Sequence, residues 1–192
     1  MYDMEYLTSQ LKKRVSSKRF IHSLGVSETA EKLAKLYNAP IEKAKIAGLL
    51  HDYAKDLQDD EAREYIVQFG LKLDDVLKFD INLAHGQIGA ELIKRELNIS
   101  DSDILNAIKY HTTGRENMSI LEKIVYIADY IEPSRDFPGV DELRQAAFSN
   151  LDEGILLALD KTITYVVKKG KLLHLNSILA RNSIIVNRNK SL

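Results

Sequence analysis

Four of the five histidines in this sequence, together with two aspartates, have the residue types and order of a two-metal site. The six residues are His22, His51, Asp52, His85, His111 and Asp129. Imidazole nitrogens and carboxylate oxygens bind transition metals while leaving coordination positions open for water and substrate. A metal held in this way activates water for attack on a substrate, so the pattern predicts a metal-dependent hydrolase.

The adjacent pair His51-Asp52 is the most specific part of this pattern. Neighbouring side chains on a helix point about 100° apart, so the imidazole can face one metal while the carboxylate reaches a second. Two ions about 3.5–4 Å apart require such a bridging group. We therefore predict that Asp52 bridges two metals and takes part in catalysis.

Helical spacing places these polar residues on buried faces. His51 and His111 have small or apolar residues three, four and seven positions earlier, and His22 has apolar residues four, eight and eleven positions later. Asp129 lies within the apolar segment 124–131, where a carboxylate without a cation or hydrogen-bond donors is costly to bury. A single inward histidine is commonly a hydrogen-bonded core residue, but six such groups without metal would leave a badly frustrated core.

The elements that must position these residues are all expected to be helices. Nearly every segment has apolar residues at helical spacing, and we find no strand alternation, internal repeat or low-complexity linker. The expected helices cover residues 4–15, 18–37, 41–55, 60–69, 84–97, 101–112, 119–132, 140–148, 152–169 and 175–187. Pro40, Gly70 and Pro133 stand at expected helix ends, and Ser119 with Glu122 has the form of a capping box. The sequence therefore predicts an all-α bundle.

The composition limits the possible functions. A length of 192 residues fits one domain, and 27 basic against 28 acidic residues give a net charge of -1. This balance argues against nucleic acid or an anionic membrane as partner, since both need a clustered positive surface. The absence of cysteine excludes disulfides, thiolate metal ligands and cysteine nucleophiles. With no apolar run long enough for a bilayer and no signal sequence at the start, we expect a cytoplasmic protein.

Longer stretches resemble a known family. The order of His22, His51-Asp52 and Asp129 resembles the signature of the HD superfamily of metal-dependent phosphohydrolases, with His85 and His111 as the extra ligands of its binuclear members. Five segments resemble the bacterial YqeK family: 19–26, 48–55, 128–135, 137–140 and 180–182. The resemblance implies a single HD-type domain over residues 1–192, with its motifs at about 18–135 and C-terminal helices at 140–187 packed on them.

The resemblance also implies an activity and a cofactor. Members of this family resemble symmetrical dinucleoside tetraphosphate hydrolases, which split diadenosine tetraphosphate into two ADP by a metal-activated hydroxide at a di-iron centre. By this resemblance one ion is held by His22, His51, Asp52 and Asp129, and the other by Asp52, His85 and His111. Iron is the expected metal, although the same ligands also bind manganese, cobalt or zinc. The preferred base and the oligomeric state, including a homodimer, stay open.

Cationic residues near the motifs are candidates for contacts with a polyphosphate. Lys55 follows His51 by four positions on the expected helix and could contact a phosphate or protonate a leaving oxygen. The alternative is a solvated lysine at a helix end. Arg135 could bind phosphate with both arms of its guanidinium, or form a surface ion pair with Glu132 or Asp136.

The basic segment 168–174, which contains a glycine, could close over the substrate. In that case Lys171 and His174 would contact the nucleotide; the alternative is that the lysines only complement the C-terminus of a helix. Thr112 is a further candidate for a substrate contact, and Arg115 has no assigned role.

Two other functions fit the same residues. A nucleotide phosphatase or alarmone hydrolase would keep the chemistry and change the substrate, because specificity lies in loops that the sequence does not shape. A non-catalytic regulatory module would keep a metal-stabilised core and act through a partner. Lys55 and Arg135 beside an open two-metal site favour an enzyme over such a module.

Overall fold

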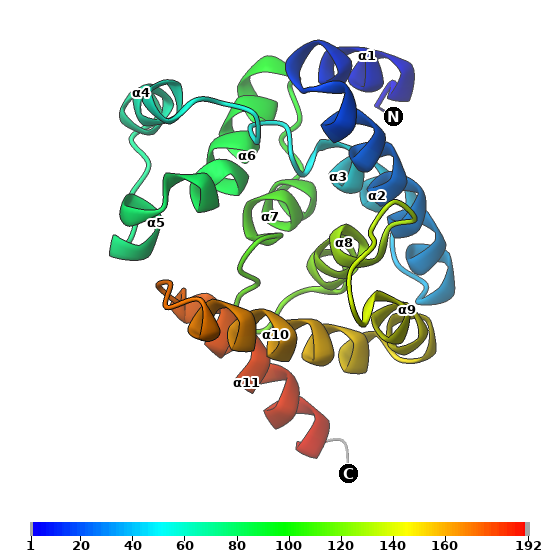
Figure 1. The fold of residues 1–192 in the computed structure, drawn as a ribbon. Coiled ribbons are helices and arrows are strands. Elements are labelled where there is room, and N and C mark those ends of the chain that lie inside the picture. The colour runs from blue at the N-terminus through cyan, green and yellow to red at the C-terminus, as the bar shows by residue number, and fades with distance from the viewer. Residues whose placement is uncertain (1, 191–192) are drawn as a thin grey trace.

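The computed structural model describes residues 2–190, and every regular element in that range is a helix (Figure 1). In chain order these are α1 (Met4–Arg14), α2 (Ser17–Leu36), α3 (Ile41–Leu50), α4 (Asp59–Phe69), α5 (Asp75–Phe79), the 3₁₀ helix η1 (Ile81–Ala84), α6 (His85–Glu96), α7 (Ser102–Tyr110), α8 (Ile120–Ile131), α9 (Val140–Ser149), α10 (Leu151–Lys168) and α11 (Leu175–Lys190). The predicted all-α bundle is confirmed.

Helix ends follow local signals in the sequence. The predicted capping box is present at the start of α8, where the Ser119 hydroxyl accepts from the Glu122 N–H and the Glu122 carboxylate accepts from the Ser119 N–H. Gly70 ends α4 in the left-handed conformation, with φ of 63°. Asn150 begins α10 by accepting hydrogen bonds from the N–H groups of the first turn. Such caps satisfy backbone groups that have no partner within the helix.

The helix expected over 41–55 is shorter than predicted. It ends at Leu50, and tight turns follow, in which the Lys55 N–H donates to the Asp52 carbonyl at 2.9 Å. The Gly48 carbonyl, which a continuing helix would pair with the N–H of Asp52, instead accepts from the His51 ring at 2.7 Å. Lys55 therefore does not lie one α-helical turn after His51, as the longer helix required.

The segment between α4 and α6 contains two short helices that the sequence did not predict. The Asp74 side chain caps α5 by accepting from the Leu77 N–H at 3.0 Å, and η1 follows one residue after α5 ends. Helices this short do not display an apolar period long enough to recognise. η1 leads directly into α6, so this segment sets where the first residue of α6 lies.

The central helices pack around a common core. α2 packs on α3 and α8, and α7 packs on α3, α6 and α8. Their facing side chains, such as Val26, Ile108 and Ile127, are fully buried. α9 and α10 pack on α8, and α11 packs on α10, at the lower edge of Figure 1. Within residues 2–190, no helix has the length and apolar character needed to span a bilayer.

Candidate metal centre

The six predicted ligands meet at one place between the central helices. His22 lies on α2, His51 and Asp52 directly follow α3, His85 begins α6, His111 directly follows α7, and Asp129 lies on α8. The four imidazoles and the carboxylate of Asp52 are buried, and Asp129 exposes 18% of its side chain. Three of the four histidines thus stand at helix ends, where the ring can reach past the helix.

Asp52 lies between two pairs of histidines. Its Oδ2 atom is 3.2 Å from Nε2 of His51 and 3.7 Å from Nε2 of His22. Its Oδ1 atom is 3.0 Å from Nε2 of His85 and 3.5 Å from Nε2 of His111. The ligand atoms of His51, Asp52 and His111 all lie within 4.8 Å of one another. Each oxygen of the carboxylate therefore faces one pair of imidazoles, as a bridging group would.

Asp129 completes the half of the cluster that contains His22. Its Oδ1 atom is 3.0 Å from Nε2 of His22 and 3.7 Å from Nε2 of His51, and the three ligand atoms lie within 4.8 Å of one another. In each half the two Nε2 atoms face each other, at 3.2 Å for His22 and His51 and at 2.9 Å for His85 and His111. We call these the His22 half and the His85 half.

Each ring is held through its other nitrogen. Nδ1 of His51, His85 and His111 donates to the carbonyl three residues earlier, at 2.7, 2.6 and 2.6 Å. Nδ1 of His22 faces the Glu132 carboxylate at 3.0 Å. A proton on Nδ1 leaves Nε2 of a neutral imidazole as the electron-pair donor, which is the usual orientation of a metal-bound histidine. Two such donors about 3 Å apart repel unless a proton or a metal ion lies between them, and divalent ions fit both pairs.

The carboxylates of Asp52 and Asp129 require positive charge close to them. Burial alone would lower the pKa of His51, but the carboxylates of Asp52 and Asp129 raise it to about 10. Burial lowers the pKa of His85 to about 4. Although burial opposes ionisation of both aspartates, the imidazoles hold the pKa of each carboxyl well below its usual range. A proton on His51 supplies the positive charge in the protein alone, and metal ions would supply it in both halves.

The two cations predicted as phosphate contacts lie beside the cluster. Nζ of Lys55 is 3.4 Å from Nδ1 of His85, and burial lowers the pKa of this lysine. The guanidinium of Arg135 donates through Nη2 to Oδ1 of Asp129 and through Nε to the carbonyl of the same residue at 2.7 Å. Arg135 is 36% exposed, so it also faces solvent, where a phosphate could approach.

Two further residues of the site were missed by the sequence reasoning. Nη1 of Arg19 donates to Oδ2 of Asp52 at 2.6 Å, and Glu132 is buried against His22. Burial opposes ionisation of Glu132, but hydrogen bonds from Ser134 and His22 lower its pKa, so it is a carboxylate. Each lies three residues from a ligand candidate, Arg19 on the same helix as His22 and Glu132 directly after the helix of Asp129, which is a weak signal because such residues are common on helices.

The other predicted substrate contacts have no recorded link to the cluster. Nε2 of His174 is 2.7 Å from Oδ2 of Asp74, and its Nδ1 accepts from the Asn176 N–H at 3.1 Å. Lys171 is exposed and Thr112 is partly buried. Among residues 2–190, the structure records no side-chain hydrogen bond or ion pair for either of them. Their substrate contacts stay predictions.

The α10–α11 hairpin, residues 151–190, is fastened to the rest of the molecule at its turn. His174 joins it to Asp74 at the start of α5. The Ser177 hydroxyl donates to the Thr113 carbonyl at 3.0 Å, just beyond the end of α7. The hairpin therefore contacts the segments that lie on either side of the His85 half.

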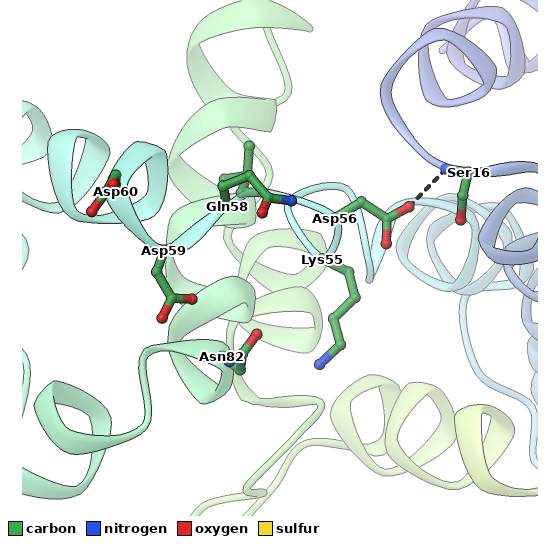
Figure 2. A pocket seen from close by; sticks show the side chains of 8 residues that line it. Ser16, Lys55, Asp56, Gln58, Asp59, Asp60 and Asn82 are labelled. Carbon is green, nitrogen blue, oxygen red and sulfur yellow. Dashed lines mark hydrogen bonds between the residues drawn. The ribbon is translucent and has the colours of Figure 1, made fainter.

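A pocket of about 710 Å³ opens beside Lys55, and Figure 2 shows this side chain below Asp56 with its tip on the side of Asn82. It is lined by Ser16, Lys55, Asp56, Leu57, Gln58, Asp59, Asp60 and Asn82. The Asn82 carbonyl holds the His85 ring, so the pocket adjoins the cluster. With three carboxylates against one lysine, the pocket suits an uncharged, hydroxyl-rich group better than a phosphate.

Comparison with known proteins identifies the family of this chain. The model of the HD domain family matches residues 19–134, which include all six cluster residues. A protein of Halalkalibacterium halodurans named symmetrical bis(5'-nucleosyl)-tetraphosphatase is 41% identical, over 92% of this chain and 94% of its own length. The protein of the same name from Bacillus subtilis is 38% identical, over 91% of this chain and 94% of its length.

A solved structure has the same fold. The crystal structure of a Clostridium acetobutylicum protein, described as a predicted HD superfamily hydrolase involved in NAD metabolism, superposes with a TM-score of 0.93. It is 49% identical in sequence, and the match covers 97% of this chain and 99% of that one. The family model, the relatives and the solved structure agree with one another, and the chain belongs to the HD domain family.

Proposed function

We propose that this protein hydrolyses dinucleoside tetraphosphates symmetrically and splits diadenosine tetraphosphate into two molecules of ADP. The observation that carries the proposal is the likeness to relatives named for this activity, at 41% and 38% identity over more than nine tenths of this chain. The meeting of six metal-binding side chains at one buried place supports it, because phosphoanhydride hydrolysis is a reaction that metal centres perform.

Two ions would be held by this chain. The His22 half, with His51, Asp52 and Asp129, would hold one ion, and the His85 half, with Asp52 and His111, would hold the other. When bound, the ions would lower the pKa of a water and neutralise charge on phosphate oxygens. Iron is the proposed metal, and manganese, cobalt or zinc would suit the same nitrogen and oxygen ligands.

The cations beside the cluster would bind and orient the phosphates. Arg19 and Arg135 each hydrogen-bond to a carboxylate of the cluster, so a phosphate that reaches these carboxylates also meets two guanidinium groups. Lys55 lies between the His85 ring and the pocket. From there its ammonium group would donate a proton to the oxygen of the departing nucleotide.

The pocket beside Lys55 would take one nucleoside of the substrate. Its volume of about 710 Å³ lies in the usual range for small-molecule sites. Asp56, Asp59 and Asn82 offer acceptors for ribose hydroxyls, while the acidic character keeps phosphate at the cluster. A nucleoside held here would place the inner phosphates over the metal-ligand candidates. Cleavage between the two central phosphates of the substrate requires this placement.

Product analysis tests this function. The protein, with metal content measured on the same sample, would be incubated with a panel of dinucleoside polyphosphates, mononucleotides and alarmones, and the products separated by chromatography. We expect ADP alone from diadenosine tetraphosphate. Equal AMP and ATP among the first products would contradict symmetrical cleavage, and faster turnover of a mononucleotide or alarmone would favour those substrates. No turnover by the metal-loaded protein would favour a regulatory module.

A further inference from the structure

One histidine of the cluster is held differently from the other three. Nδ1 of His22 faces Oε1 of Glu132 at 3.0 Å, whereas the other three rings donate to backbone carbonyls. Glu132 directly follows α8, at the end away from Ser119, and is 1% exposed. A buried carboxylate persists only where its hydrogen bonds offset the loss of hydration, so its contacts indicate its role.

The carboxylate of Glu132 is fixed by its own turn. The Ser134 N–H donates to Oε2 at 2.7 Å and the Ser134 hydroxyl donates to Oε1. The backbone carbonyl of the same glutamate accepts from Arg144 at 3.0 Å. These bonds tie both the side chain and the main chain of Glu132, and leave Oε1 directed at α2. The carboxylate is therefore held in the position where it can accept a hydrogen bond from the His22 ring.

The close approach depends on a residue without a side chain. A Cβ atom at Gly25 would lie 2.6 Å from Oε2 of Glu132, well inside the distance at which real atoms pack. Gly25 lies three residues after His22 in the interior of α2, where its backbone is helical and glycine is otherwise unfavourable. The space it leaves is filled by the carboxylate, which is an observation independent of the hydrogen bonds.

We infer that Glu132 is a positioning residue that holds His22 with Nε2 turned to the metal, and that Gly25 makes the room it needs. A hydrogen-bond acceptor on Nδ1 fixes the tautomer of the ring and makes it a stronger electron-pair donor to a metal. A charged carboxylate does this more strongly than a neutral carbonyl. The inference rests on the proposed function only in that a divalent ion binds to the His22 half. It makes no claim about the products of the reaction.

Metal titration of the purified, metal-free protein tests the inference. The probe is Co²⁺ alone, with binding followed by absorption and by competition with a chelator. Glu132→Gln keeps the shape and removes the charge, and Glu132→Ala removes the support. We expect each to weaken Co²⁺ binding at one of the two positions by about 10- to 100-fold, the usual effect of losing such a partner. Unchanged affinity at both positions in a folded Glu132→Ala protein would overturn the inference.

A double-mutant cycle tests the role of Gly25. Gly25→Ala should displace the carboxylate and weaken Co²⁺ binding as Glu132→Ala does. In the Glu132→Ala background, the same change should have little further effect, because the clash is gone. The matched control is Gly89→Ala in the interior of α6, where the new Cβ would meet Ala54 at an ordinary 3.6 Å. Additive losses from Gly25→Ala and Glu132→Ala would contradict the inference.

A metal-independent measurement separates this inference from the proposed function. Nitrogen NMR shifts of His22 in the metal-free protein should report a proton on Nδ1 in the wild type. In Glu132→Ala that proton should be lost, because only the Asp129 carboxylate, 3.0 Å from Nε2, would still accept from the ring. Circular dichroism would verify that both proteins are folded. A proton that stays on Nδ1 in both proteins would refute the positioning role even if no Co²⁺ binds. A wild type that binds Co²⁺ but releases AMP and ATP would instead refute the proposed function alone.

Discussion

Asp52 is the residue on which both halves of the cluster depend, since each oxygen faces a different pair of imidazoles. We predict that the wild-type protein carries close to two ions per chain and that Asp52→Asn loses both of them, together with activity. The reason is that the amide keeps the shape of the side chain but removes the anion shared by the two positions. Elemental analysis checks this prediction, and a fully active protein with at most one ion would end the two-metal model.

Arg135 is expected to act on substrate and not on metal. Its guanidinium is 36% exposed and donates to Asp129, but it is not itself a metal-ligand candidate. Arg135→Ala should therefore leave both ions bound. The loss in kcat/KM should correspond to roughly 1–3 kcal/mol, the range for a charge-assisted hydrogen bond. Steady-state kinetics check this prediction, with Arg95→Ala, at an exposed arginine of α6, as the charge control. Wild-type kinetics of Arg135→Ala would reduce this residue to an ion-pair partner of Asp129.

The six ligand candidates could be recognised from the sequence because their residue types are rare and their spacing to apolar neighbours is regular. Arg19 and Glu132 could not be recognised in the same way. Arginine and glutamate are common on helix surfaces, and the distances of 2.6 Å to Asp52 and 3.0 Å to His22 arise only when separate helices meet. His174 was predicted as a substrate contact, and a pairing with Asp74 across 100 residues has no local signal.

At the level of helices, the cluster depends on how closely α6 approaches the end of α7. A Cβ atom at Gly86 would lie 2.9 Å from the Ile108 carbonyl, the group that holds the His111 ring, and 2.8 Å from the Lys109 carbonyl. We predict that Gly86→Ala lowers the free energy of unfolding by about 1–3 kcal/mol, as overpacking does.

The same change should also deplete metal from the His85 half, because both rings of that half lie at the contact. Chemical denaturation and elemental analysis on one sample would measure the two effects, and Gly89→Ala on the same helix is the control. A Gly86→Ala protein that keeps both ions and full stability would mean that α6 can shift without disturbing the ligands.

Most helices could be predicted because an apolar stripe and a cap define each of them locally. Their ends near the cluster could not, since His51 bonds to the Gly48 carbonyl and stops α3 five residues before the predicted end. Here a hydrogen bond from a side chain of the cluster affects where the helix ends, and the apolar period of the sequence does not indicate that bond. The short helices α5 and η1 were missed because they have too few turns for any period.

At the level of the whole molecule, the cluster joins segments from five helices. Ligand candidates reach it from α2, α3, α6, α7 and α8, so a bound ion links most of the central packing. Removal of metal with a chelator should lower the melting temperature reversibly. An ion present at 100 times its dissociation constant stabilises the folded state by about 2.7 kcal/mol per site.

Differential scanning calorimetry before chelation, after chelation and after adding metal back checks this prediction. The Asp52→Asn protein serves as the control, because it should show no response to chelator. Identical melting temperatures with and without metal in the wild type would mean that the core is stable around four buried imidazoles without cations. This result would contradict the argument that the core is frustrated when no metal is bound.

The sequence predicted the fold class and, through its resemblance, the family, but not how the helices are arranged. Nothing local in the sequence indicates that α11 returns to the end of α7 or that His174 reaches α5. Contacts of this kind join residues far apart in the chain and depend on the whole packing. The sequence therefore indicated which helices form, but not which of their ends meet.

Two of the contacts that attach the α10–α11 hairpin, both at its turn, have a consequence for how fast metal leaves. Ser177 is bonded to Thr113 beyond the end of α7, and His174 is paired with Asp74, ahead of the segment that leads into α6. If the turn of the hairpin detaches, both sides of the His85 half lose a contact at once, while α10 stays packed on α8 and α9. The residence time of that ion should then follow a local opening event. Amide exchange in α11 and the rate of metal release should therefore rise together in a His174→Ala protein.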